Sequence, residues 1–590
     1  MNTTKTGESD MDSSTLSRWW TDAESAHNDF VQRAKIATDF VLPDKQWNRD
    51  DIQILDSQNK PHLTINKVFP IVYFLSGYQR QNKFDIIATA KKVDRVSDIE
   101  AKIISQCIKG ITDDDDAQYE ISDWFLTGII KGLSWLGGYV DYQDDPINGD
   151  LKLESLNPYD IYPDPNARKY GLQDASFLFK KLWKSVAELR ELFPGKVPDI
   201  NATSIDNADD IIYGEGDEYR DINDRTLVLR HTEKVRVKEC WYLTDKTVAY
   251  LIDQKTGEII ELDSGADEKI RNIKAIKPEL AVVKRPKKVL HLSTSIGNTI
   301  LQDIENPIGK INRIPFVPFY AYKIDNNVFG VVDQLIDVQK EVNKRRSQAL
   351  HIVNTMTNNL WLLHESAGLN EGEFLRKVSK VGGAVTWKGN VPPQNVGPTG
   401  AQGAQVATYA SEQAESDIKE ISGVNADLMG YSADRKEPGI VLQLRQAQGA
   451  VVIESIMDNF RYSNRILGSL LIDFIQKSGL YSPNEIVKIT DEQGQEVDMG
   501  VASILGDNTL KKYKVAVSFQ KSAPTLRTAD FMKLMSLVEK GVPIPPDVLI
   551  EASDIPYKDK ILQRLHAAQA EQAAQPAAGV PGKPIIIPGR

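Results

Sequence analysis

Apolar residues recur at spacings of three and four in several stretches of the first 110 residues, and this spacing is typical of amphipathic helices. It predicts helices over residues 15–42, 66–83 and 96–109. Pro43 is expected to end the first helix, because a proline has no N–H to continue the hydrogen-bond ladder. The second helix begins with an apolar cluster and finishes in an amide-rich run, Tyr78–Lys83, which a buried helix would not need.

Strand patterns follow in the next 200 residues. Residues 124–143 read as a helix that continues through two glycines into a strand, and residues 154–171 as a loop rich in Pro, Asp and Asn. Alternation of apolar and polar residues over 226–245 and 289–303 predicts antiparallel strands. The first half of the chain is therefore expected to be an α+β body.

The second half changes from alternation to helical periodicity. It is strong over 330–356 and again over 404–424, and the stretch between them, 358–403, is rich in Gly and Pro near its end. Two helices that flank a small β insert predict a hairpin whose tip stands away from the body. Gly423 is expected to end the second helix. The apolar stripe of the first helix consists of Val331, Leu335, Val338, Val342, Ala349, Ile352 and Met356.

The longest helical pattern covers residues 440–477, contains no proline, and would span roughly 57 Å at 1.5 Å per residue. Compact enzyme domains rarely need so long a helix, whereas elongated assemblies do. Residues 481–520 resemble a β hairpin in which "NEIVKI" pairs with "KYKVAVSF". Two shorter helices are expected within 527–571, and the last 16 residues predict a tail without fixed structure of its own.

Length and charge narrow the class of protein. A chain of 590 residues is too long for one hydrophobic core, so several domains or an elongated body are expected. The net charge of −11 argues against a protein that grips nucleic acid tightly, because tight binding neutralises phosphates with surplus Lys and Arg. It does not argue against a protein that lets nucleic acid pass.

Cysteine use and the absence of long apolar runs predict a soluble protein made in a reducing compartment. Cys107 and Cys240 are the two cysteines, and they form no C-x-x-C pair that would indicate a zinc site. The N-terminal residues are polar and acidic, unlike a signal peptide. No apolar run approaches the ~20 residues that a membrane helix needs.

Catalytic motifs are absent from the sequence. There is no phosphate-binding G-x-x-x-x-G-K-[ST], no G-x-S-x-G and no H-E-x-x-H, and the seven histidines never fall at metal-ligand spacing. We therefore expect no enzyme activity, no cofactor and no metal. The acidic run Asp113–Asp116 has two interpretations: helix N-terminal acids, which complement the helix dipole and are favoured, or a metal site of a DNA-processing enzyme.

One basic cluster lies on the helix of residues 330–356: Lys340, Lys344, Arg345 and Arg346. It is either an ordinary solvated face, supported by i,i+4 pairing such as Glu341 with Arg345, or, repeated around a ring, a belt that steadies a passing phosphate backbone. The sequence leaves both interpretations open.

The order of these parts resembles a tailed-phage portal protein of the short-tailed, podovirus type. Five stretches carry the resemblance, in order and within residues 30–480: "LTINKVFPIVYFLSGYQRQNK", "GLSWLGGYVDY", "LNPYDIYPDP", "IPFVPFYAYKID" and "GIVLQLRQAQG". The alternative interpretation is a soluble structural scaffold of long helices, unrelated to DNA passage.

The resemblance implies a ring of twelve copies at one capsid vertex and a division of each copy into named parts. These parts are an α+β wing (1–327), a first stem helix (328–357), a clip (358–403), a second stem helix (404–423), a channel loop (424–439), the long helix and β hairpin of the wing (440–520), a helical crown (521–570) and a flexible tail (571–590).

The resemblance also implies partners and a location. Besides itself, the protein would contact the terminase large subunit, which is the ATPase motor, the major capsid and scaffolding proteins, and a head-completion or tail adaptor protein. Double-stranded DNA would pass through the channel without sequence-specific binding. The protein would be located in the virion after assembly in the host cytoplasm, with no membrane contact.

Three groups of site residues are expected under this resemblance. The DNA-channel candidates are the basic cluster together with Arg435 and Lys436. The subunit-interface candidates, whose amide and guanidinium groups give directional hydrogen bonds, are Gln79, Arg80, Gln81, Asn82, Arg445 and Gln446. For the polar residues within 78–83 the alternative interpretation is ordinary helix solvation or capping. The clip docking candidates are Trp387, Lys388, Asn390, Pro392 and Pro393.

Overall fold

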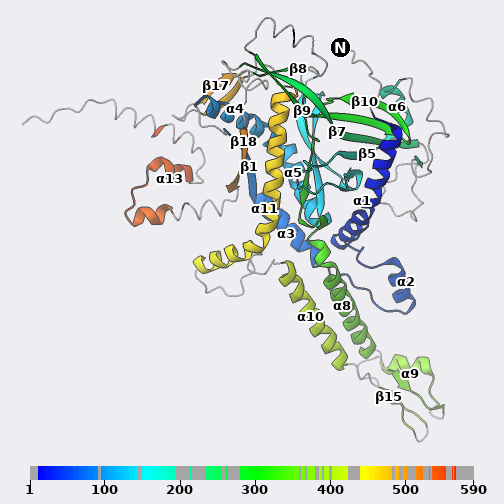
Figure 1. Ribbon diagram of the computed structural model, residues 1–590. Coiled ribbons are helices and arrows are strands. Elements are labelled where there is room, and N and C mark those ends of the chain that lie inside the picture. Colours follow the sequence, from blue (N-terminus) through cyan, green and yellow to red (C-terminus); the bar gives the residue numbers. More distant parts are fainter. Residues whose placement is uncertain are drawn as a thin grey trace, which may run out of the picture. The chain divides into compact units, whose positions relative to one another are not determined.

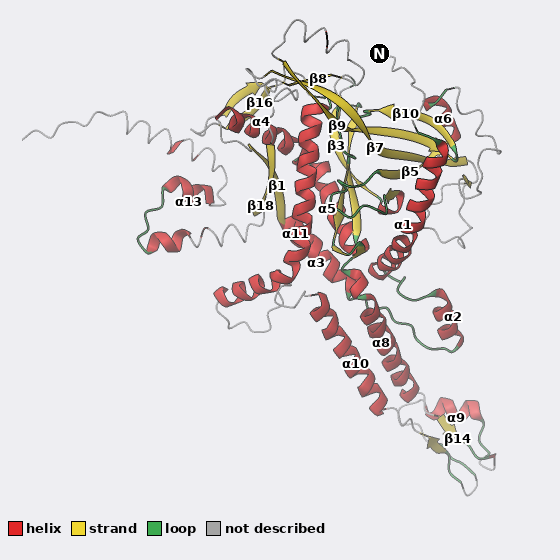
Figure 2. Ribbon diagram, in the orientation of Figure 1, coloured by secondary structure: helices red, strands yellow, loops and turns green. Residues whose placement is uncertain are grey.

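The structure is a computed structural model of the chain, and it has mixed helix and sheet, as expected for an α+β protein (Figures 1 and 2). It divides into two compact units, residues 1–76 with 86–517, and residues 77–85 with 518–590. The described residues are 11–90, 95–143, 146, 149–194, 211–213, 233–253, 259–262, 271, 280–357, 360–365, 368–378, 385–388, 391–396, 401–422, 439–480, 486–490, 496–500, 513–521, 531, 534–552, 561 and 564–565.

The N-terminal helices form where the apolar periodicity predicts them. They are α1 (Ser13–Val41), α2 (Arg49–Ser57), α3 (Val68–Gln81), α4 (Arg95–Thr112) and α5 (Asp115–Lys131). Only α2, which buries no residue, was not predicted. The acidic run lies at the start of α5, with Asp114 at the N-cap and Asp113 within 3.9 Å of Lys109, which is the position expected of helix N-terminal acids.

The turn between α5 and strand β2 (Leu133–Asp141) occurs earlier than predicted. Gly132 ends α5 with a φ of 89°, a left-handed conformation that costs glycine least. A Cβ at this position would meet the backbone of Phe329 at 2.7 Å, so close approach also favours glycine here. The two glycines expected at the turn, Gly137 and Gly138, instead lie inside β2, where Phe316 and Phe474 leave little room for a side chain.

A large antiparallel sheet contains strands in both segments predicted from alternation, although residues 226–232 of the first segment lie outside the described residues. Its strand order is β10-β9-β7-β5-β4, and β6 and β8 also pair with β7. The strands are β4 (Ile161–Pro163), β5 (Phe177–Ser185), β6 (Ile211–Tyr213), β7 (Glu233–Asp253), β8 (Ile259–Leu262), β9 (Leu280–Ile296) and β10 (Thr299–Glu305). The segment predicted as loop, 154–171, is only partly irregular, because it contains β4 and the short helix η1 (Pro158–Asp160).

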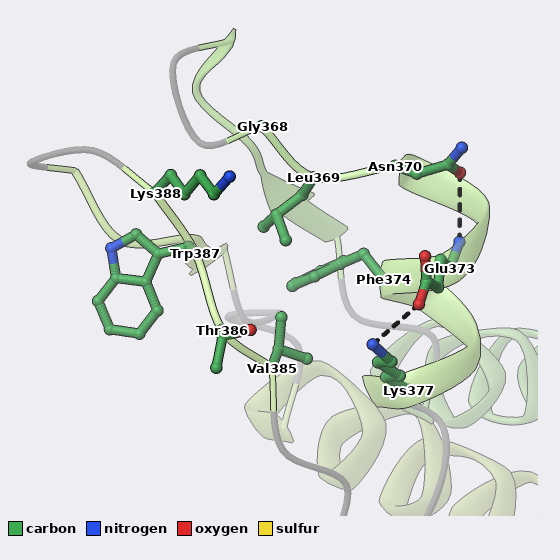
Figure 3. Close-up of a pocket in the computed structure, with 10 residues that line it drawn as sticks. All are labelled: Gly368, Leu369, Asn370, Glu373, Phe374, Lys377, Val385, Thr386, Trp387 and Lys388. Carbon is green, nitrogen blue, oxygen red and sulfur yellow. Dashed lines mark hydrogen bonds and ion pairs between the residues drawn. The ribbon is translucent and has the colours of Figure 1, made fainter.

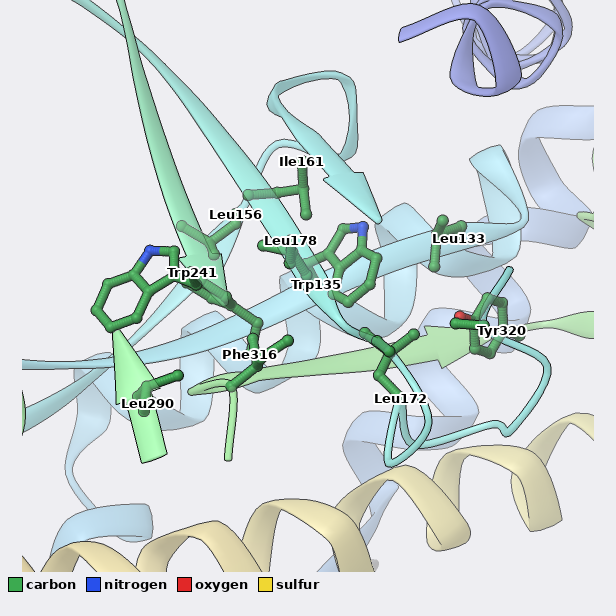
Figure 4. Packing of buried hydrophobic residues seen from close by; sticks show 13 residues of the cluster. Leu133, Trp135, Leu156, Ile161, Leu172, Leu178, Trp241, Leu290, Phe316 and Tyr320 are labelled. Carbon is green, nitrogen blue, oxygen red and sulfur yellow. The ribbon is translucent and has the colours of Figure 1, made fainter. Parts of the chain in front are cut away.

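A three-stranded sheet, ordered β11-β2-β3, packs with the large sheet over one core (Figure 4). Its outer strands are β3 (Asp150–Leu156) and β11 (Phe316–Tyr320). Trp135 of β2 is fully buried, and Trp241 of β7 meets the ring of Phe316 edge-on, with centroids 5.6 Å apart. Helix α1 packs its own buried stripe, including Trp20, on β4, β5 and β7.

The remaining helices and strands have the following residue ranges. They are α6 (Val186–Leu192), β12 (Tyr322–Ile324), β13 (Asn327–Phe329), η5 (Val332–Gln334), α8 (Ile336–Thr357), β14 (Leu360–Leu362), α9 (Glu371–Val378), β15 (Gln394–Val396), α10 (Ala401–Ser422), α11 (Gly439–Lys477), β16 (Ile486–Thr490), β17 (Glu496–Gly500), β18 (Tyr513–Lys521), β1 (Asn82–Ala90) and α13 (Pro546–Ala552). Gly423, the expected end of the second hairpin helix, lies outside the described residues.

The hairpin predicted within residues 481–520 is present, but its second strand is not the predicted one. β16 pairs antiparallel with β17, which is only a few residues away, and not with β18. A short connection loses less chain entropy on closing, which favours the local pairing. β18 instead pairs with β1, more than 400 positions earlier in the chain, so no local pattern could have indicated it.

The long helix α11 confirms the longest predicted pattern and is held by aromatic rings. Phe460 is fully buried, and its ring lies 5.1, 4.9 and 5.0 Å from those of Trp124, Phe125 and Phe319. The first two of these belong to α5 and the third to β11. One cluster therefore joins the long helix to the helix and sheet that precede it by more than 100 residues.

Replacing Phe460 with Ala removes the ring shared by these elements and leaves a cavity. We expect a loss of about 3–5 kcal/mol of unfolding free energy, measured by chemical denaturation followed by tryptophan fluorescence. Arg465→Ala, on the exposed side of the same helix, is the control and should change stability by less than about 0.5 kcal/mol. Equal effects of the two substitutions would contradict the central place of the aromatic cluster.

Candidate functional site

Helices α8 and α10 lie side by side, and the chain between them forms a small insert at one end (Figures 1 and 2). The predicted helix–insert–helix hairpin is therefore present. Val342 of α8 and three residues of α10, Ser411, Ala414 and Ile418, are at most 3% exposed. Apolar and small side chains are thus buried where the two helices contact each other.

Glu415 of α10 ties three segments together. One of its carboxylate oxygens accepts a hydrogen bond from Nη2 of Arg346 on α8 at 2.8 Å, and the other lies 3.1 Å from Nζ of Lys67. Burial alone would raise the pKa of Glu415, but the hydrogen bonds from Arg346 and Lys67 outweigh it and hold the pKa below its usual value. The carboxylate is therefore charged and fixed at neutral pH.

A stripe of buried polar residues on α8, here called the polar ladder, consists of Gln339, Asn343 and Ser347, which are at most 6% exposed. Residues four apart share one face of a helix. Each accepts a hydrogen bond from a backbone N–H of the preceding extended segment: Lys67 N to Gln339 Oε1 at 3.0 Å, Ile65 N to Asn343 Oδ1 at 3.0 Å, and Leu63 N to Ser347 Oγ at 2.8 Å.

The polar ladder is further connected at both sides. Gln339 Nε2 donates to the Ile65 carbonyl at 2.7 Å, and Asn343 Nδ2 donates to Gln46 Oε1 at 2.7 Å. A second amide, Asn66, donates from Nδ2 to the Val41 carbonyl at 2.9 Å. Segment 62–67 thus satisfies its backbone through side chains of α8 instead of a sheet. This feature was not predicted from the sequence, where its only signal is Gln, Asn and Ser at i, i+4 and i+8.

The basic cluster on α8 does not form one face. Arg346 points to Glu415 of α10, and Arg345 pairs with Glu341 of its own helix at 3.3 Å. Lys340 pairs with Asp337 at 3.2 Å and remains exposed, as does Lys344. A DNA-facing belt built from all four residues stays a prediction, and Arg346 is the member that this chain already uses internally.

The amide-rich end of α3 divides into buried and exposed residues. Gln79 and Asn82 are 2% and 8% exposed, and Asn82 Nδ2 donates to the Tyr78 carbonyl at 2.9 Å. Arg80 and Gln81 are exposed. Of these four interface candidates, only Arg80 and Gln81 therefore have side chains exposed on a single chain. The interface role of all four residues stays a prediction.

Several other predicted site residues are placed only in part. Arg445 and Gln446 belong to α11, although their side chains are not described. Arg435, Lys436 and Asn390 lie outside the described residues.

The insert between α8 and α10 has one helix, α9, and one strand pair, β14 with β15. A cavity of about 310 Å³ opens between α9 and residues 385–388 (Figure 3). Its apolar lining includes Leu369, Phe374 and Val385, and the charged side chains around it include Glu373, Lys377 and Lys388. Lys377 Nζ lies 2.9 Å from a carboxylate oxygen of Glu373.

Phe374 is the one buried residue of the insert among those whose exposure is described. Of the predicted docking residues, Trp387 is 48% exposed, Lys388 and Pro392 are exposed, and Pro393 is half-buried. An indole held at the surface beside a cavity with both apolar and charged lining residues is typical of a protein-binding surface. The insert thus displays apolar groups that its own core does not cover.

The order of these parts now has a counterpart among known proteins. A family model described as the phage P22-like portal protein matches residues 17–582. The chain belongs to this portal protein family. No curated protein matches it significantly.

Portal proteins of this family are structural proteins of the phage head-to-tail connection. Membership implies a multimeric ring in the virion that interacts with capsid and tail components. Within the described residues, no group of three His, Cys, Asp or Glu side chains could hold a metal ion, and no helix is long and apolar enough to cross a membrane.

Replacing Asn343 with Ala in this portal chain removes the acceptor for the Ile65 amide and the donor to Gln46. A buried hydrogen bond lost in this way costs about 1–3 kcal/mol, so hydrogen exchange at residues 63–67 should accelerate about 10- to 100-fold, as measured by NMR or mass spectrometry. Gln348→Ala, on the exposed side of α8, is the matched control and should leave exchange unchanged. Unchanged exchange in Asn343→Ala would refute the polar ladder as the anchor of this segment.

Proposed function

We propose that twelve copies of this portal chain form a ring at one capsid vertex, and that double-stranded DNA enters and leaves the head through its centre. The family match over residues 17–582 carries this proposal. Under it, α8 and α10 form the stem, the insert forms the clip, and residues 424–439 reach the channel. Assembly takes place in the host cytoplasm with capsid and scaffolding proteins.

The charge of the chain supports passage without capture. Twelve copies at −11 each carry about −132, whereas tight binding of DNA requires phosphates to be neutralised by surplus cations. Lys340, Lys344 and Arg345, with Arg435 and Lys436 of the channel loop, are the candidates for local contact with phosphates. Such sparse positive charge would steady the duplex while the acidic ring as a whole lets it slide.

The energy for packaging comes from a partner under this proposal. The sequence contains no phosphate-binding loop, so the portal chain supplies the conduit and the terminase large subunit supplies ATP hydrolysis. We propose that the insert docks this motor during packaging and a head-completion or tail adaptor protein afterwards. Its exposed Trp387 and the cavity lined by Leu369 and Phe374 support the docking role.

Native mass spectrometry and electron micrographs of the purified protein test the ring. We expect a particle of twelve chains of 65.9 kDa, about 790 kDa, with a central hole wide enough for duplex DNA. The chain should be supplied with scaffolding and coat proteins if it remains monomeric alone. Filaments or solid particles without a hole would instead favour a helical scaffold that takes no part in DNA passage.

Substitution of Trp387 by Ala tests the docking surface. Removing a half-exposed indole from the centre of an interface typically costs 2 kcal/mol or more, so affinity for the terminase large subunit should fall about 30-fold or more with rings intact. The measurement is biolayer interferometry on immobilised rings. Ile324→Ala, 60% exposed and outside the insert, is the matched control. Full affinity in Trp387→Ala would remove the indole from the docking surface.

A further inference from the structure

The two helices of the stem pair differ in charge. α8 carries four basic and two acidic side chains, and α10 carries four acidic and one basic. Only one ion pair between the two helices, Arg346 with Glu415, uses these charges within the chain's described residues. The remaining charged side chains of both helices lie on the side that faces away from the partner helix or at the edges of that side.

On α10, the side opposite α8 is polar and acidic. Its inward side is set by Ala414 and Ile418, which are buried, and residues two positions away from these lie about 200° around the helix. Glu420 is therefore turned away from α8. The exposed side chains of this outward face are Tyr409, Glu412, Gln413, Ser416 and Glu420, of which Tyr409 is 70% exposed.

On α8, the side opposite α10 carries two lysines and one aspartate, Asp337, which pairs with Lys340. Val342 is buried and Arg346 bonds to α10, and Lys344 lies two residues from each, about 200° around the helix. The same outward face includes Lys340, which keeps 47% of its side chain exposed although it pairs with Asp337 and its Nζ lies 5.7 Å from the centroid of the Phe40 ring. No ion pair joins Lys344 to any residue that the structure describes.

A ring closes by placing two different faces of the same chain in contact, because each copy meets its neighbours through opposite sides. When the helix pairs of successive copies stand side by side, α8 of one copy faces α10 of the next. If the helix pair runs along the ring axis, the rotation that relates neighbouring copies leaves each residue's position along that axis unchanged. Two residues at the same position along the axis in one copy are then also level with each other across the contact between copies.

The ion pair of Arg346 with Glu415 sets the heights of the two antiparallel helices. Lys340 is six residues before Arg346, and Glu420 is five residues after Glu415. Because the helices are antiparallel, both steps run the same way along the pair, and Lys340 and Glu420 differ by about 1.5 Å along the helix axes. Lys344 differs from Glu420 by three residues, about 4.5 Å, within reach of a lysine side chain. Both lysines therefore meet the same carboxylate of the neighbouring copy.

We propose that Lys340 and Lys344 on α8 of one copy pair with Glu420 on α10 of the adjacent copy, an interaction surface whose partner is a second copy of this chain. The inference rests on the proposed ring. Exposed ion pairs are weak singly, but a closed ring repeats this one at every interface. The contact also fixes the order of the helices around the ring, because α8 against α8 would place like charges together.

This assignment competes with the DNA-facing role of the same lysines. A phosphate backbone would also attract Lys340 and Lys344, but it would leave Glu420 without a cationic partner. The neighbouring copy matches both the basic and the acidic face. The complementarity therefore favours the chain itself as the partner.

A charge swap tests the contact. Neither Lys344 nor Glu420 forms an ion pair with another described residue, so Lys344→Glu and Glu420→Lys should leave the single chain folded. We expect each substitution alone to raise the concentration at which half of the rings dissociate about 10-fold at low salt. The two together should restore it to within about 3-fold of the unsubstituted ring. Sedimentation velocity at 50 and 500 mM NaCl gives the measurement, and the difference should shrink at high salt.

Lys288→Glu, an exposed lysine of β9, is the control and should leave the ring unchanged. Rings of normal stability in Lys344→Glu, with altered retention of packaged DNA, would overturn the pairing and assign the lysine to DNA. Two single defects that add in the double variant would overturn it as well. Absence of rings in the unsubstituted protein, measured first in the same conditions, would instead count against the proposed function itself.

Discussion

The position of α8 depends on the satisfaction of buried backbone groups by side chains. An N–H removed from water without a hydrogen-bond partner costs free energy comparable to that of a lost bond, and an extended segment outside a sheet has no neighbouring strand to bond. Gln339, Asn343 and Ser347 supply the missing acceptors for three alternate residues of segment 62–67. Since the N–H groups of an extended chain that point the same way recur every second residue, a helical i, i+4 stripe matches them at about 6 Å intervals.

The ladder fixes more than one helix. Segment 62–67 leads directly into α3, and Lys67 at its end shares Glu415 with Arg346. The start of α3, the first half of α8 and the middle of α10 are therefore held by one continuous set of polar contacts. Directional bonds of this kind specify a register, whereas apolar packing alone would tolerate sliding of the helices. Because this register is fixed, the residues on the outward faces of α8 and α10 have defined positions relative to one another along the helix axes.

Local patterns in the sequence were sufficient for the long helices and for the presence of strands in the large sheet, but the one strand pairing that they predicted, of residues 484–489 with 512–519, is wrong. Apolar spacing placed α1, α3, α4 and α11 to within a few residues, because each buries one stripe. What the patterns did not contain were partners distant in the chain. The pairing of β18 with β1 and the aromatic cluster around Phe460 join segments separated by more than 100 positions.

The same limit applies to the candidate site. Arg346 resembled its basic neighbours in the sequence, and only the proximity of Glu415, 69 residues later, separates it from them. Gln339, Asn343 and Ser347 carry no signal in the sequence beyond their spacing of four residues. Their burial depends on an extended segment that has no periodicity of its own.

The sparse interior of the insert has a consequence for the order of events at the vertex. With Phe374 as the only buried side chain among those described there, the insert stores little conformational free energy of its own, and reshaping it costs correspondingly little. Under the proposed function, a module of this kind would adapt its form to the protein bound to it. Two unlike proteins could then occupy it in succession without a large conformational cost to the insert.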